Sequence, residues 1–86
     1  MERIVVRLKD YKNNKIIKKR KVFNNFEECK QYIDSLFINL KENECIRLKF
    51  ISDKYLSKRG ELYTNNTREE LEHAYHIIKK WLSEND

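Results

Sequence analysis

The first third of the chain carries the hydrophobic pattern of a β-hairpin. Apolar and polar positions alternate over residues 3–11, which predicts a half-buried strand. Its inward side chains are Ile4, Val6 and Leu8, and its outward ones are Val5, Arg7 and Lys9. A turn at residues 12–15 follows, where Asn13 and Asn14 suit the left-handed conformations of a tight hairpin. Residues 15–23 then predict a return strand that is rich in lysine and alternates poorly.

Two later segments repeat their apolar residues at helical spacing. Each starts at a capping-box-like pair, Asn25 with Glu28 and Thr67 with Glu70. The apolar stripe of the first predicted helix is Phe26, Cys29, Ile33, Leu36, Phe37 and Leu40. The stripe of the second is Leu71, Ala74, Tyr75, Ile78, Trp81 and Leu82. Both helices therefore need an apolar surface to pack against.

A third strand supplies a second such surface. Its inward residues are Ile46, Leu48 and Phe50, and its outward residues are Arg47 and Lys49. The stretch 52–60 has no clear pattern, although residues 58–61 resemble a turn around Gly60. A short fourth strand through Leu62 and Tyr63 is expected to follow.

The order strand, strand, capped helix thus runs twice, with a displacement of about 42 residues. The similarity is carried by the first and third strands and by the starts and ends of the helices. It predicts an α+β fold with tandem ββα-ββα halves, 1–43 and 44–86, within one domain, 1–86. We expect a four-stranded antiparallel sheet with both helices on one face, the first and third strands in the centre and the second and fourth at the edges.

Composition is that of a small globular protein. Of the 86 residues, 40% are hydrophobic and 12% are aromatic, which is enough to build a core. The absence of proline and the single glycine argue against linkers. No apolar run is long enough for a membrane span, and the first strand begins too early for a signal peptide. We therefore expect a soluble, cytoplasmic protein without membrane association.

The formal net charge of +5, from 19 basic and 14 acidic residues, favours polyanionic partners. Abundant Lys, Asn and Ile are typical of an AT-rich genome, such as that of a low-GC bacterium, an archaeon or one of their viruses. That bias also raises the lysine content independently of function. Cys29 and Cys45 are expected to be buried, reduced thiols, and the alternative of a single disulfide stays open.

The central strands point to a basic surface. If both helices cover one face of the sheet, Arg7, Lys9, Arg47 and Lys49 emerge on the other. A two-residue turn at Asn13 and Asn14 would add Arg20 opposite Arg7 and Lys18 opposite Lys9. Like charges facing each other across strands are unfavourable, so their accumulation favours an anionic ligand. The sequence therefore predicts a non-enzymatic module that binds nucleic acid or another polyanion through these six residues, with Tyr11 and Tyr55 flanking them as possible stacking partners for bases. The alternative is a solvated basic face without a ligand.

Other chemistry has weaker support. The two histidines, His73 and His76, share a predicted helix with Glu70, whose E-x-x-H spacing to His73 resembles carboxylate metal sites. Both histidines are expected on the solvent side without ligands from a second element, so we predict no metal and no cofactor. One glycine cannot build a P-loop or a dinucleotide fingerprint, and no serine or cysteine has the context of a nucleophile.

A second functional hypothesis is a protein-binding inhibitor or accessory factor encoded by a virus or mobile element. Such a factor would act on a host enzyme that handles nucleic acid, including a defence nuclease. The short chain, the lack of catalytic residues and an available edge strand favour it. Ile38, Ile77 and Trp81 lie off or at the edge of their stripes and offer an apolar contact patch. A homodimer through this patch remains open.

Overall fold

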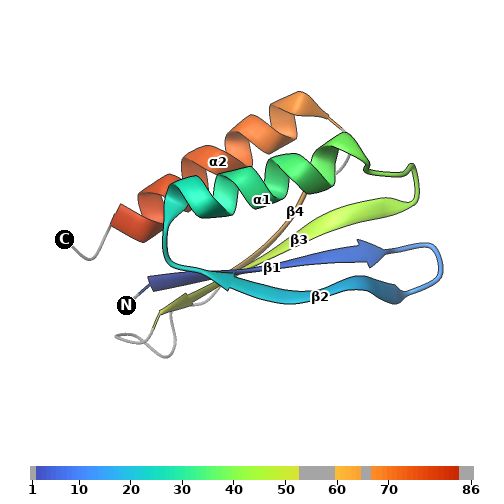
Figure 1. The fold of residues 1–86 in the computed structure, drawn as a ribbon, viewed down its shortest axis with the longest axis horizontal. Helices are drawn as coiled ribbons and strands as arrows, with labels where there is room; N and C mark the ends of the chain where they lie inside the picture. The colour runs from blue at the N-terminus through green and yellow to red at the C-terminus, as the bar shows by residue number, and fades with distance from the viewer. Residues whose placement is uncertain (1, 53–59, 65–66, 84–86) are drawn as a thin grey trace.

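The computed structural model describes residues 2–52, 60–64 and 67–83, and for Ser52 and residues 60–64 it places the strand but not the side chains. Four strands and two helices follow one another in the order ββαββα (Figure 1). The elements are β1 (Glu2–Asp10), β2 (Lys15–Phe23), α1 (Phe26–Ile38), β3 (Glu44–Ser52), β4 (Gly60–Thr64) and α2 (Arg68–Ser83). The α+β class predicted from the sequence is confirmed.

Three nine-residue strands make up most of the sheet. β1 lies between β2 and β3 and pairs antiparallel with both, and the five-residue β4 adds to β3, which gives the order β2-β1-β3-β4. This corrects the predicted architecture: the sheet is a three-stranded unit, β2-β1-β3, with a short β4 appended, and not a four-stranded sheet made of equivalent ββα repeats. The second strands of the two halves, KIIKKRKVF and GELYT, share neither length nor charge, so the similarity between the halves does not extend through the hairpins.

The β1–β2 hairpin closes through a wider turn than the sequence predicts. Residues 11–14 form the turn, with Asn14 in the left-handed region at a φ of 55°. The Asp10 carboxylate accepts hydrogen bonds from the backbone N–H groups of Lys12 and Asn13, at 3.0 and 3.1 Å, and from the Asn13 side chain at 2.8 Å. This is the geometry by which an aspartate stabilises a turn.

The pairing of β2 with β1 then shifts register twice, between Val6 and Leu8 and again between Leu8 and Lys9. Lys18 comes to lie opposite Leu8, and Lys9 lies opposite Ile16. The predicted pair of Lys9 with Lys18 is therefore wrong, and Arg7 falls within the first shift instead of directly opposite Arg20. The shifts arise because β2 lacks the alternation that would fix one register along its whole length.

Both predicted helix starts are confirmed. The Asn25 side chain accepts a hydrogen bond from the Glu28 backbone N–H at 3.1 Å, and the Thr67 hydroxyl accepts one from the Glu70 backbone N–H at 3.2 Å. Each cap satisfies a backbone donor that the first helical turn leaves without a partner.

The core lies between the two helices and one face of the sheet, so both helices cover the same side (Figure 1). The sheet contributes alternate residues of β1 and β3, and the helices contribute their predicted stripes. Its most deeply buried side chains include Ile4, Val6, Ile33, Ile46, Leu48, Leu71 and Ile78. Among the described residues, no helix is both long and apolar enough to cross a membrane.

Candidate nucleic-acid interface

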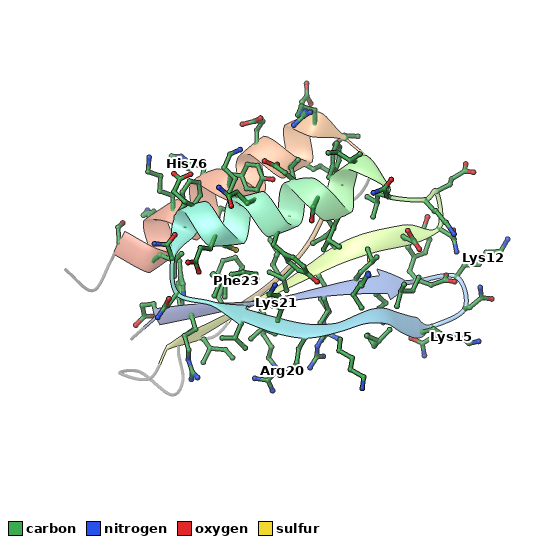
Figure 2. All side chains as sticks on the ribbon, in the orientation of Figure 1. Lys12, Lys15, Arg20, Lys21, Phe23 and His76 are labelled. Atoms are coloured by element: carbon green, nitrogen blue, oxygen red, sulfur yellow. The ribbon has the colours of Figure 1, made fainter. Side chains whose placement is uncertain are left out.

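The sheet surface away from the helices, here the open face, gathers six cations. Strand alternation places the odd-numbered residues of β1 and β3 on this face, since the even-numbered ones fill the core. Arg7 lies directly opposite Arg47 across the two strands. From β2, Arg20 points to the same side, away from the helices (Figure 2). The open-face cations are Arg3, Arg7, Lys9, Arg20, Arg47 and Lys49.

Two small apolar side chains lie beneath these cations. Val5 and Cys45 occupy open-face positions, yet each is only 2% exposed. Lys49 stands opposite Val5 in the register, and Lys9 stands opposite Cys45. Long basic side chains cover apolar surface with their methylene stems while their charged ends stay in water. The cations of β1 and β3 are accordingly half-buried, which restricts their conformations before any ligand binds.

β1, β2 and β3 carry no carboxylate on the open face. Glu2, Asp10 and Glu44 take even-numbered positions at the ends of β1 and β3, on the helix side. In the register of the sheet, β4 brings Glu61 opposite Lys49 and Tyr63 opposite Arg47. Burial raises the pKa of the Cys45 thiol, and the positive charges of Lys9 and Arg47 act in the opposite direction. Both cations therefore lie near the buried Cys45 thiol.

Charge is divided between the two layers of the fold. The three long strands carry ten basic and three acidic residues, whereas the helices carry four basic and six acidic ones. The positive net charge thus resides on the sheet. A polyanion approaching the molecule would be drawn to the sheet and repelled by the helices.

Five of the six residues predicted from the sequence to bind nucleic acid lie together on the open face: Arg7, Lys9, Arg20, Arg47 and Lys49. Lys18 does not, because the register shifts turn it toward the helix side, where it lines a hollow beside Tyr32. Arg3 was missed by sequence reasoning, although the same alternation along β1 places it on this face. Of the two predicted flanking tyrosines, Tyr55 lies outside the described residues.

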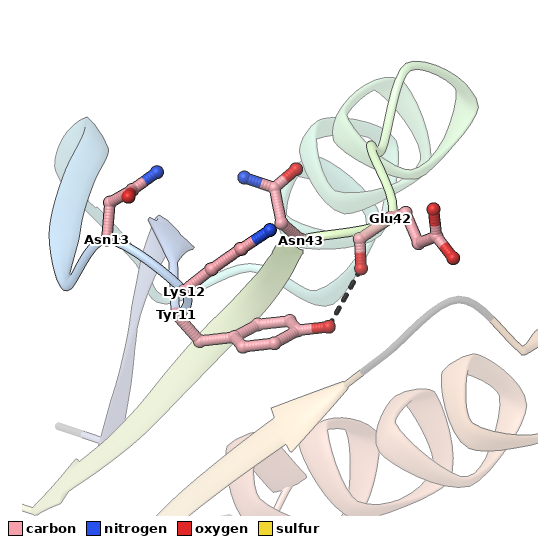
Figure 3. Close-up of a pocket in the computed structure, with 5 residues that line it drawn as sticks. All are labelled: Tyr11, Lys12, Asn13, Glu42 and Asn43. Atoms are coloured by element: carbon pink, nitrogen blue, oxygen red, sulfur yellow. Dashed lines mark hydrogen bonds between the residues drawn. The ribbon is translucent and has the colours of Figure 1, made fainter.

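Tyr11 belongs to a different feature, a polar hollow at the tip of the β1–β2 hairpin (Figure 3). Its hydroxyl donates a 2.8 Å hydrogen bond to the Glu42 carbonyl, and its backbone N–H donates to the Asn43 carbonyl at 3.1 Å. The hollow is lined by Tyr11, Lys12, Asn13, Glu42 and Asn43. These contacts connect the hairpin tip to the segment before β3, so Tyr11 has a structural role at this hollow.

Other reactive groups of the described residues lack the geometry of an active site. His73 and His76 of α2 are both exposed, and His76 lies on the side of the helix away from the sheet (Figure 2). No three potential metal ligands of the described chain cluster together. Cys29 and Cys45 are buried, free thiols. Burial raises the pKa of the Cys29 thiol to about 12, which suppresses the nucleophilic thiolate.

Comparison with known proteins adds no assignment: no family model, curated protein or solved structure matches the chain at a significant level. The open face therefore has to be interpreted from its own chemistry.

Proposed function

We propose that the protein is a non-enzymatic module that binds nucleic acid through the open face. The observation that carries the proposal is the half-buried array of cations on β1 and β3, centred on the opposed Arg7 and Arg47, with Arg20 added from β2. Like charges brought together in this way cost stability, and a ligand with regularly spaced negative charges would offset that cost.

Phosphates suit this array better than bases do. Neighbouring open-face positions are separated by about 4.8 Å across strands and by about 6.6 Å along a strand, which gives a two-dimensional array of donors. On the open face, β1, β2 and β3 carry no aromatic side chain on which a base could stack, and the register of β4 places Tyr63 beside Arg47 at one margin of the array. The contacts would thus be made with the backbone of the nucleic acid, which carries little sequence information.

Salt dependence gives a direct test, with fluorescence anisotropy on a labelled duplex of mixed sequence. If all six open-face cations contact phosphates, the affinity should fall about 10³-fold between 50 and 200 mM salt, because each contact on duplex DNA releases close to one counterion. Replacing Arg7 and Lys49 by Gln should reduce this fall to about 10²-fold and weaken binding at low salt at least tenfold.

A matched variant, Lys41→Gln with Lys80→Gln, removes the same net charge from exposed positions outside the open face. It should retain binding within about threefold, since screened charges at a distance contribute little. Absence of binding at low salt would overturn the proposal, and so would an equal loss of affinity in both double variants.

A further inference from the structure

We propose that β2 and the groove beside it bind an extended, acidic segment of a partner protein by strand addition. This inference concerns the edge of the sheet and does not depend on nucleic acid binding to the open face. The site consists of the outer edge of β2 and a hollow between β2 and α1, here the edge groove, lined by Leu8, Lys18, Tyr32, Ser35, Leu36 and Asn39.

The outer edge of β2 is available for pairing. β2 ends the strand order and pairs only with β1 within the described sheet. Its residues 15–22 are all exposed, and only Phe23 at its end is buried. An edge strand of this length presents backbone N–H and C=O groups that an added strand can satisfy.

β2 also exposes more apolar surface than a protected edge requires. Of the five large apolar side chains that the described residues expose, three belong to β2: Ile16 at 47%, Ile17 at 45% and Val22 at 43%. Ile16 and Val22 lie opposite Lys9 and Val5 in the register and so flank the open face. A strand laid along β2 would cover these side chains on one side of the sheet.

On the other side, the same strand would meet the edge groove, a hollow of about 390 Å³. Its apolar wall is formed by Leu8 of β1 and Leu36 of α1, which are 6% and 8% exposed. Nearby, the Lys21 ammonium lies 4.7 Å from the centre of the Tyr32 ring, so a fixed cation borders the groove. Alternate side chains of an added strand point to one face, and an apolar one there would enter the groove.

The positive charge of β2 favours an acidic partner segment. β2 carries five cations and no carboxylate, namely Lys15, Lys18, Lys19, Arg20 and Lys21. A second copy of β2 would place five cations against five, which disfavours self-pairing. A segment with acidic residues would instead form cross-strand ion pairs, and its backbone amides would complete the ladder, which a nucleic acid cannot do.

The experiment begins with selection of binders from a displayed library of random twelve-residue peptides. We expect the selected peptides to be rich in Asp and Glu, with apolar residues at alternate positions. A synthetic copy should shift and protect the backbone amides of β2 in NMR spectra. Methylation of the alternate backbone nitrogens of that peptide that face β2 should weaken binding at least tenfold, because it removes the donors of the ladder.

Charge reversal in the protein provides the matched comparison. Lys18→Glu with Lys19→Glu should weaken peptide binding at least tenfold, whereas Lys41→Glu with Lys80→Glu, which changes the net charge equally, should change it less than threefold. All four positions are exposed, so both variants are expected to fold.

Several results would overturn the inference: no enriched peptide, amide shifts confined to β1 and β3, or peptide binding that is unchanged by backbone methylation. An oligonucleotide that shifts the β2 amides when no peptide does would overturn it as well. Loss of nucleic acid binding in the Arg7 and Lys49 variant tests a different surface, so the two proposals can fail separately.

Discussion

Removing the Tyr75 hydroxyl should loosen the packing of α2 against α1, by an amount that depends on pH. The ring of Tyr75 is buried, at 5% exposure, and its hydroxyl donates a hydrogen bond to the Asp34 carboxylate of α1. The other oxygen of Asp34 accepts from the Lys30 ammonium at 2.9 Å. The Tyr75→Phe substitution keeps the ring and its packing and deletes only this donor.

The magnitude follows from the charge and exposure of the acceptor. A hydrogen bond to a charged group stabilises a protein by about 1.5–3 kcal/mol when it is well shielded from water. Asp34 is 35% exposed, so water can replace part of the lost interaction. We therefore expect Tyr75→Phe to lower the free energy of unfolding by about 1–2 kcal/mol at pH 7, with a fall of roughly 4–8 °C in Tm for each kcal/mol.

The pH dependence is set by Asp34. Partial burial raises the pKa of its carboxyl, but the hydrogen bonds from Tyr75 and Lys30 outweigh burial and hold the pKa below its ordinary value. Because the pKa of Asp34 is lower in the folded protein than in the unfolded chain, the ionised carboxylate stabilises the fold at pH values above the unfolded pKa of about 3.9. This stabilisation is lost as the pH falls through the pKa of Asp34 in the folded protein. Without Tyr75 the pKa of Asp34 rises, so the variant loses less stability in acid and the gap from the wild type narrows.

Urea unfolding followed by the fluorescence of Trp81, which packs against Phe50, measures both effects between pH 7 and pH 3. Tyr11→Phe is the matched control, since it removes a hydroxyl that donates to an uncharged carbonyl. It should cost about 0.5–1 kcal/mol, with no change over this pH range. Equal stability of Tyr75→Phe and the wild type at pH 7, or a gap that stays constant in acid, would refute the reasoning.

Three further predictions concern local features. Asn25→Ala should lower the free energy of unfolding by about 1 kcal/mol in urea titrations, because the first helix loses its cap. Cys29 and Cys45 should react with an aromatic disulfide reagent only on unfolding, since burial raises the pKa of both thiols, and rapid labelling in the native state would contradict this. Asp10→Asn should reduce the urea midpoint at pH 7 but much less in acid. Hydrogen bonds, chiefly the one from the Asn13 side chain, lower the pKa of Asp10, and the stabilisation they give is lost when Asp10 is protonated.

The parts of the fold that were predictable from sequence are those specified by local signals. The helix caps at Asn25 and Thr67 depend on contacts three residues away, and the inward residues of β1 and β3 follow strict alternation. Such patterns need no knowledge of the rest of the chain. The position of four cations on the central strands followed from the same alternation.

The register of β2 was not predictable in this way. Its two ends are fixed by different constraints: Phe23 is buried opposite Ile4, while the turn anchored by Asp10 places Lys15 opposite Asp10. The two alignments differ by two residues, and the shifts absorb the difference. The burial of Val5 was also missed, because it depends on basic stems from the neighbouring strand and not on the character of β1 itself.

These register shifts have a consequence for how β2 distributes its charge. In an unshifted hairpin, Lys18 and Arg20 would face the same side of the sheet, since they are two residues apart. In the structure, Arg20 joins the open face while Lys18 and Lys21 turn toward α1. One basic strand contributes cations to two surfaces: Arg20 to the open face, and Lys18 and Lys21 to the border of the edge groove. Lys19 and Lys21 would face the helices in that unshifted hairpin, opposite Leu8 and Val6, so the groove would be positive in either register. The shifts place Lys18 opposite Leu8 in place of Lys19 and take one cation from the open face. An acidic strand therefore fits this edge because of the charge of β2 as a whole, and not because of its irregular pairing.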